Sequence, residues 1–123
     1  MLGDTITITL GGSGGTARVC NKINQDNYSA EYLNRNSTDE IRVKVRHSKE
    51  SNLLNGLPVE RHNMEITQTV FPAVVGDPSV TRQWYFVARC NPDDTVADQV
   101  DVGEALAFFM DATNLPKIVG WES

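Results

Sequence analysis

The feature that most constrains how this chain can fold is the dipeptide Asn55-Gly56. A two-residue turn between antiparallel strands needs positive φ at both central residues, and Asn followed by Gly favours that turn strongly. Long segments in which polar and apolar residues alternate flank the dipeptide on both sides. The sequence therefore predicts a central β-hairpin whose turn is centred on residues 55 and 56.

An uninterrupted ladder from this turn predicts a register for the two strands. One face then carries polar rows, with Glu50 opposite Arg61, Ser48 opposite Asn63, Arg46 opposite Glu65, Lys44 opposite Thr67 and Arg42 opposite Thr69. The other face is mostly apolar, with Val45 opposite Ile66, Ile41 opposite Val70, His47 opposite Met64 and Val43 opposite Gln68. We therefore expect a solvated face, with an opposite-charge pair at Arg46 and Glu65, and a packing face.

The remaining elements are predicted around this hairpin. Residues 4–10 alternate between aliphatic side chains and threonine, which is typical of a half-buried strand, and a glycine-rich reversal leads into a second strand over 16–23. Further predictions are a short strand around 29–33, an exposed loop over 71–81, a last strand over 82–90, and a helix that Asp94, Thr95 or Asp98 could cap. Six or seven strands followed by one or two helices predict an α+β chain, with helices gathered on one face of an antiparallel sheet.

Length and composition indicate one globular domain. The chain has 123 residues, of which 40% are hydrophobic and 22% charged, and this is not the composition of a disordered protein. A net charge of -5 argues against indiscriminate coating of nucleic acid, so any RNA contact must come from a local patch. No segment resembles a membrane span or a signal peptide, so we expect a soluble cytosolic protein without a membrane partner. Cys20 and Cys90 lack metal-ligand spacing, and two reduced thiols are expected.

The C-terminal helix bears on the oligomeric state. Val102, Leu106, Phe109 and Met110 fall on one helical face, so the helix should pack on something apolar. A single helix of this length covers only part of so wide a sheet. A second subunit is therefore expected to complete the core.

Two motifs that suggest small-molecule chemistry have simpler interpretations. Gly12, Gly14 and Ala17 fit a loose dinucleotide-binding pattern, but no helix follows them, and a hairpin turn is favoured. His47 and His62 stand in strands without metal-ligand or nucleophile spacing around them, which favours packing-face or edge positions.

Acidic residues near the start of the helix raise the question of calcium. Asp93, Asp94 and Asp98 supply oxygen ligands but lack the spacing of a dedicated loop, so a solvated helix start is favoured. No nucleophile, base and orienting group can be assembled from the sequence, so we do not expect an enzyme or a small-molecule substrate.

A run of basic residues is the strongest candidate for a binding site. The predicted register puts most of Arg42, Lys44, Arg46, Lys49 and Arg61 on one sheet face, within reach of a phosphate backbone. A merely solvated face is the alternative interpretation.

Several segments carry a resemblance to a known family: Leu2-Gly3-Asp4-Thr5, Gly11-Gly12-Ser13-Gly14-Gly15-Thr16-Ala17, Lys22-Ile23-Asn24-Gln25-Asp26, Lys44-Val45-Arg46-His47-Ser48-Lys49-Glu50-Ser51, Glu60-Arg61-His62-Asn63, Gly103-Glu104-Ala105-Leu106 and Gly120-Trp121-Glu122-Ser123. Together they resemble the coat proteins of the single-stranded RNA bacteriophages, the levivirus type, and most of all the branch that infects Caulobacter. The resemblance covers nearly the full chain in order.

This resemblance implies a fold and an assembly. The expected fold is α+β, one domain over 1–123, with an N-terminal β-hairpin at about 4–23, a five-stranded antiparallel sheet at about 29–91 and two helices at about 95–121. The helices of two subunits are expected to interlock, and the homodimers to assemble into a T=3 icosahedral capsid. The protein would belong to the virion, after synthesis in the cytoplasm of the bacterial host. No cofactor is implied, and calcium at subunit interfaces stays open.

The resemblance also implies that the inner sheet face binds single-stranded genomic RNA. One target is a stem-loop near the start of the replicase gene, so the protein would act as a translational repressor. The loop at 71–81 is expected to change conformation between symmetry environments. Carried over by position, the RNA contacts fall on Arg42, Lys44, Arg46, Arg61, Asn63, Glu65, Trp84, Phe86 and Ala88.

The last strand leaves one question open. Trp84 could stack on an unpaired base, whereas Phe86 and Ala88 stand where relatives have polar residues. The alternation with Tyr85 and Val87 does not decide which row faces RNA, and Trp84 as a core residue is the alternative. The leading hypothesis is an RNA-packaging coat protein, and the alternative is a free dimeric RNA-binding regulator without a shell.

Overall fold

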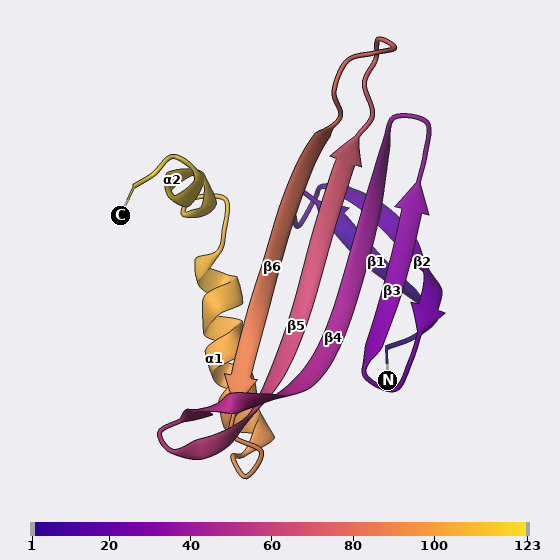
Figure 1. The fold of residues 1–123 in the computed structure, drawn as a ribbon. Coiled ribbons are helices and arrows are strands. Elements are labelled where there is room, and N and C mark those ends of the chain that lie inside the picture. The colour runs from indigo at the N-terminus through magenta and orange to yellow at the C-terminus, as the bar shows by residue number, and fades with distance from the viewer. Residues whose placement is uncertain (1, 123) are drawn as a thin grey trace.

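The computed structural model describes residues 2–122 and confirms the predicted order of strands and helices. Six strands form one antiparallel sheet in chain order, namely β1 Thr5–Leu10, β2 Thr16–Gln25, β3 Ser29–Arg35, β4 Asp39–Leu54, β5 Leu57–Val70 and β6 Val80–Cys90. Two helices follow, α1 Val96–Phe109 and α2 Leu115–Val119 (Figure 1).

The expected five-stranded sheet beside a separate hairpin is wrong. Within the described residues, four strands lie between positions 29 and 90, and the N-terminal hairpin is continuous with them. β2 extends past Ile23 to Gln25, and its final residues pair with β3. The register shifts between Lys22 and Asn24, an irregularity of the kind that bends a strand. The hairpin is thus the bent end of a six-stranded sheet.

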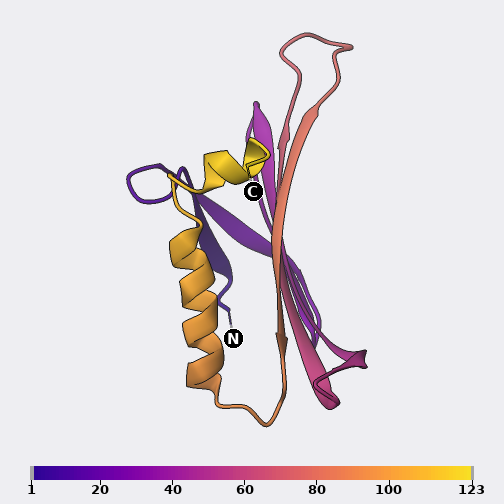
Figure 2. The same cartoon turned by 90° about the vertical axis from the view of Figure 1, so that its left-hand side faces the viewer.

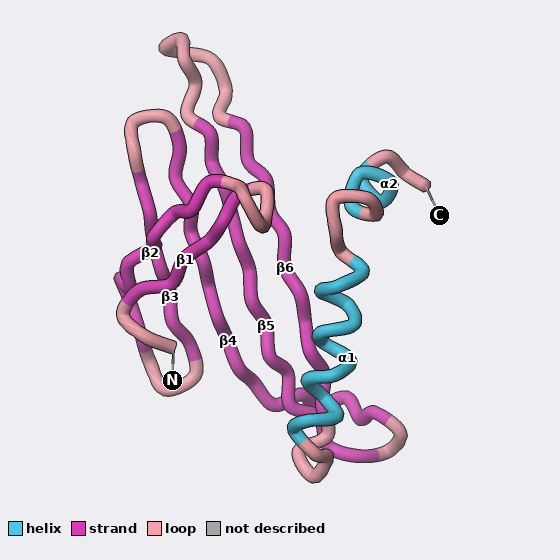
Figure 3. The backbone as a smooth tube through the Cα atoms, turned by 180° about the vertical axis from the view of Figure 1, so that it is seen from behind, coloured by secondary structure: helices cyan, strands magenta, loops and turns pink. Residues whose placement is uncertain are grey.

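This bend builds the core. The β1–β2 hairpin lies over one face of the sheet, as both the side and rear views show (Figures 2 and 3). The fully or nearly fully buried residues of the cluster are Cys20, Tyr32, Ile41, Val43 and Val45, with Ile6, Ile8 and Leu10 packed against them. The predicted alternation of β1 is confirmed, because its aliphatic residues are half-buried and its threonines are exposed.

The predicted turn at the centre of the chain is confirmed. Asn55 and Gly56 adopt φ of 52° and 73°, the positive values that the two-residue turn requires. Leu54 lies opposite Leu57, as predicted.

The predicted register beyond that turn is wrong by two residues. Glu50 lies opposite Val59 and Arg46 opposite Asn63, because β4 has three residues between Glu50 and Leu54 where β5 has only Pro58. Proline has no N–H to donate to the ladder, which explains why pairing is interrupted beside it. Since side chains alternate with a period of two, a shift of two residues changes partners without exchanging faces.

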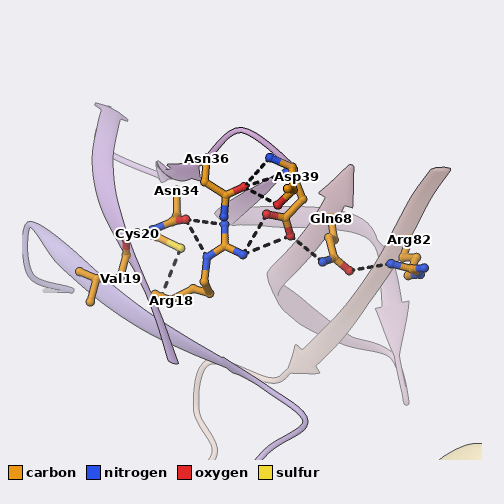
Figure 4. A network of polar contacts seen from close by, with 9 residues as sticks. Arg18, Val19, Cys20, Asn34, Asn36, Asp39, Gln68 and Arg82 are labelled. Carbon is orange, nitrogen blue, oxygen red and sulfur yellow. Dashed lines mark hydrogen bonds and ion pairs between the residues drawn. The ribbon is translucent and has the colours of Figure 1, made fainter. Parts of the chain in front are cut away.

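A polar network fastens the hairpin to the sheet (Figure 4). The guanidinium of Arg18 on β2 lies 2.9 Å from the carboxylate of Asp39 on β4 and donates to Asn34 Oδ1 on β3. Gln68 on β5 donates to Asp39 at 2.8 Å and accepts from Arg82 on β6 at 3.0 Å. These hydrogen bonds, with that of Gln68 first and the ion pair with Arg18 contributing, hold the pKa of Asp39 below its usual value. The network therefore joins five strands at one end of the sheet.

The helices leave much of their apolar surface uncovered. α1 lies on the same side of the sheet as the β1–β2 hairpin (Figure 2), yet no residue of α1 or α2 is buried. Thr95 occupies the N-cap position without a side-chain capping bond. The exposed apolar side chains of α1 are Val96, Val100, Val102, Leu106, Phe108 and Phe109. The apolar partner expected for this helix is not supplied by the described part of the chain.

Three smaller expectations have structural outcomes. The predicted exposed loop is present between β5 and β6, at residues 71–79. Cys20 and Cys90 are free cysteines, and only Cys20 is buried. Neither helix within residues 2–122 is long and apolar enough to cross a membrane.

Candidate nucleic-acid interface

The pairing of β3 to β6 determines which side chains share a face, because directly opposite residues project to the same side of a sheet. Three rows run across all four strands on the polar face: Ser29, Arg46, Asn63 and Val87; Glu31, Lys44, Glu65 and Tyr85; and Leu33, Arg42, Thr67 and Gln83. Ser48, Arg61 and Arg89 form a further row. Six of the nine positions carried over from the family therefore lie together, namely Arg42, Lys44, Arg46, Arg61, Asn63 and Glu65.

Trp84 is not on this surface, so its expected place beside the basic residues is wrong. It lies opposite Ile66, which lies opposite the buried Val43, and Phe86 and Ala88 follow Trp84 on the same apolar face. The register across the 71–79 loop decides this placement, and the alternation of β6 alone does not.

Tyr85 is the aromatic residue that the structure places on the polar face. It lies opposite Glu65, and the residue is 64% exposed. The position of Tyr85 was not predicted, because Trp84 was chosen from its place in the family pattern. The signal that could have identified Tyr85 is which alternate residues of β6 share a face with those of β5. The loop between the two strands leaves this undetermined in the sequence.

The arginines of this face are held by carboxylates. Arg46 donates to Glu65 at 3.1 Å, which confirms the predicted pair as diagonal rather than directly opposite neighbours. Arg89 lies 2.8 Å and Arg61 3.6 Å from the carboxylate of Glu50. Each of these guanidinium groups is thus partly neutralised within the sheet.

Arg42 stands at the centre of a second charge cluster. It donates to Glu31 and lies 3.4 Å from Glu40, which also pairs with Arg35. The hydrogen bond to Glu31 raises the pKa of Arg42, and the hydrogen bond from Arg35 lowers the pKa of Glu40. Both shifts favour the charged forms of the two side chains.

A shallow hollow opens at one end of the polar face. Arg46, Arg61 and Asn63 line it together with Ser48 and the turn formed by residues 26–29. Asn63 is only 8% exposed, and its Oδ1 has no hydrogen-bond partner among residues 2–122. A buried acceptor without a partner is costly to leave unpaired, and Asn63 is thus an unsatisfied polar residue at the wall of the hollow.

The two histidines lie on the apolar face, as the packing-face expectation proposed. His47 and His62 are directly opposite each other, and their Nδ1 atoms are 2.9 Å apart. No group of three or more His, Cys, Asp or Glu residues that could hold a metal ion is found between residues 2 and 122.

Comparison with known protein families supports the family resemblance seen in the sequence. A family model described as phage phiCb5 coat protein matches residues 3–91. No curated protein matches the chain.

Solved structures share the fold at low sequence identity. A virus-like particle of bacteriophage ESE058 matches with a TM-score of 0.71 and 9% identity, covering 96% of this chain and 95% of that one. A virus-like particle of Beihai levi-like virus 21 matches with a TM-score of 0.70 and 17% identity, covering 97% and 94%. The coat protein of bacteriophage EMS014 gives 0.69 and 10%, covering 87% and 72%. At these identities, the likeness concerns the fold alone.

Proposed function

Because this chain belongs to the phage phiCb5 coat protein family, we propose that it assembles with copies of itself into an icosahedral capsid and binds single-stranded RNA on its polar sheet face. The observation that carries the proposal is the contrast between the two faces of one sheet. The polar face presents Lys44 and five arginines, whereas the apolar face is only partly covered by the same chain. One face suits a polyanion, and the other suits a second subunit.

Homodimerisation would complete the apolar face. Trp84 and Phe86 remain 47% and 49% exposed on β6, and the apolar side chains of α1 are exposed on the same side of the sheet. β6 is also an edge strand, so its outer backbone groups are free to pair with another strand. We propose that the partner's β6 continues the sheet and that the helices of the two subunits interlock over it.

RNA recognition would combine charge with base contacts. Lys44, Arg42, Arg46 and Arg61 would contact phosphates. Tyr85 would offer a ring on which an unpaired base stacks. Asn63, which lines the hollow beside Arg46 and Arg61, would contact RNA that enters it. Such contacts would allow binding of a stem-loop and hence repression of replicase translation, as in the family that the sequence resembles.

Assembly is tested on the full chain, expressed in bacteria and purified without denaturation. Gel filtration followed by negative-stain microscopy should show uniform spheres that contain RNA, which is in keeping with the virus-like particles of the ESE058 and Beihai levi-like virus 21 relatives. A stable monomer without RNA would overturn the proposal. Free dimers that bind RNA but form no spheres would instead favour the regulator hypothesis.

RNA binding is tested with a matched pair of lysine variants. Lys44→Ala removes a cation from the polar face, and Lys49→Ala removes one from the same strand on the opposite face. We expect Lys44→Ala to weaken RNA binding and to reduce the slope of log affinity against log salt by about 0.7, the value for one phosphate contact on a single strand. Equal effects of the two variants, or no effect of Lys44→Ala, would remove the polar face from the RNA-binding account.

A further inference from the structure

The carboxylates of the polar face carry an inference about how RNA binding is controlled. Every arginine that β3 to β6 present on this face is ion-paired to at least one of four glutamates, namely Glu31, Glu40, Glu50 and Glu65, and Arg42 is paired to both Glu31 and Glu40. Lys44 is the only cation of this face, among the described residues, without an ion pair. The face is therefore less cationic toward a polyanion than its arginines alone would make it.

The glutamates lie deeper in the face than the arginines. Their side chains are 14–23% exposed, whereas the paired arginine side chains are 33–58% exposed. An approaching phosphate would therefore meet guanidinium groups whose charge is offset from below.

Lys44 stands between two of these pairs. It lies directly opposite Glu31 on one side and Glu65 on the other, yet neither carboxylate forms an ion pair with it. Glu31 is taken by Arg42 and Glu65 by Arg46, which are the same-face neighbours of Lys44 along β4. The centre of the face thus holds one unpaired ammonium flanked by two neutralised arginines.

We infer that Glu31 and Glu65 mask Arg42 and Arg46 against non-specific RNA, so that Lys44 supplies most of the sequence-independent attraction. The inference rests on the proposed RNA binding and specifies how that binding is limited. An RNA that fits the face can also gain base contacts near Tyr85 and Asn63, whereas an unrelated strand gains little beyond phosphate contacts with neutralised arginines. The masking glutamates would in this way favour a matching RNA over arbitrary RNA without adding contacts to either.

The test replaces each masking carboxylate by its uncharged isostere in the full chain. Glu31→Gln and Glu65→Gln are compared with Glu60→Gln, which makes the same charge change on β5 but on the opposite face. The probe is a short fluorescent oligouridylate, added to protein stripped of nucleic acid and titrated at several salt concentrations. Thermal melting of each variant confirms that it is folded.

We expect Glu31→Gln and Glu65→Gln each to tighten oligouridylate binding by about three- to sevenfold, the effect of removing one charge about 7 Å from a phosphate in a largely aqueous setting. The salt slope should steepen by about 0.7 in each variant, and Glu60→Gln should change neither quantity. Unchanged or weaker binding in the polar-face variants would overturn the inference and assign the glutamates to positioning of the arginines. Failure of wild type and of both glutamine variants to bind oligouridylate would overturn the proposed function as well, whereas wild-type binding that the substitutions leave unchanged would overturn the inference alone.

Discussion

The apolar face of this sheet has two halves that differ in their cover. Over β3 and β4 the β1–β2 hairpin folds back, and Tyr32, Ile41 and Val43 are fully buried. On β6 the same face carries Trp84 and Phe86, which stay about half exposed in a single chain. Residues of similar hydrophobicity thus differ in how deeply they are buried within one sheet. The difference shows that the first half of the core depends on the chain itself and, under the proposed dimer, the second half depends on assembly.

The largest expected effect lies in the covered half. Ile41→Ala removes buried methyl groups from a site enclosed by the hairpin and should lower the free energy of unfolding by about 2–5 kcal/mol. Urea denaturation of the full chain should give the same difference from wild type at low and high protein concentration. Ile41→Val is the matched control and should cost about 0.5–1.5 kcal/mol. A negligible loss in Ile41→Ala would show that the hairpin does not seal this half of the core.

The uncovered half should respond through association instead. Trp84→Ala should weaken subunit association by about 2 kcal/mol, the threshold effect of a buried aromatic anchor at an interface. Sedimentation of RNA-free protein measures the dissociation constant. Tyr85→Ala, which changes the neighbouring aromatic residue on the opposite face, should weaken association less, because it removes only side-chain contacts along the proposed β6–β6 pairing. Equal sedimentation of Trp84→Ala and wild type would break the proposed link between exposure on β6 and assembly.

The smallest effect concerns the polar network that fastens the cover to the sheet. Asp39→Asn removes the charge that Arg18 and Gln68 engage and should lower the free energy of unfolding by about 1.5 kcal/mol at neutral pH, the scale of a hydrogen bond to a charged group. Unfolding curves at several pH values provide the measurement.

The pH dependence of this variant has a definite sign. The pKa of Asp39 is lowered in the folded protein, so its contribution is complete above the unfolded value of about 3.9 and is lost as the pH falls through the folded value. The gap between Asp39→Asn and wild type should therefore narrow only below about pH 4. A gap that is constant down to strongly acidic pH would mean that the Asp39 charge does not fasten the hairpin.

Local patterns predicted the elements well, because each depends on a few neighbouring residues. The alternation of β1 and the pair Asn55-Gly56 were sufficient for two hairpins and for the turn geometry. The separation of polar from apolar residues on β4 and β5 was also predictable, since it depends only on period-two alternation.

Pairing between strands was less predictable. The ladder of the central hairpin was assumed to run without interruption, but Pro58 cannot donate a hydrogen bond to it and three residues of β4 lie opposite this one residue. Pro58 was the available signal, yet it does not state how many residues the irregularity takes up. The number of strands implied between positions 29 and 91 was likewise too high, because the family pattern was transferred without a register.

The residues of the candidate site likewise differ in how well the sequence predicted their positions. Arg42, Lys44 and Arg46 could be grouped because they alternate on one strand, and Asn63 and Glu65 because the hairpin turn relates the two strands. Trp84 could not be placed in this way, since the loop at 71–79 separates β6 from its neighbour and both rows of β6 carry large apolar residues. The ion pairs with Glu31 and Glu50 depend on side-chain conformations that no sequence pattern specifies.

The irregularity beside Pro58 has a consequence for how the central hairpin tolerates changes in length. β4 carries two more residues than β5 between the pairs Glu50–Val59 and Leu54–Leu57, and the polar and apolar faces nevertheless remain where alternation puts them. An insertion or deletion of an even number of residues near the tip leaves this sorting intact, whereas a single residue in an uninterrupted ladder would set the polar side of one strand beside the apolar side of the other. For this hairpin, whether the number of inserted or deleted residues is odd or even matters more than how many there are.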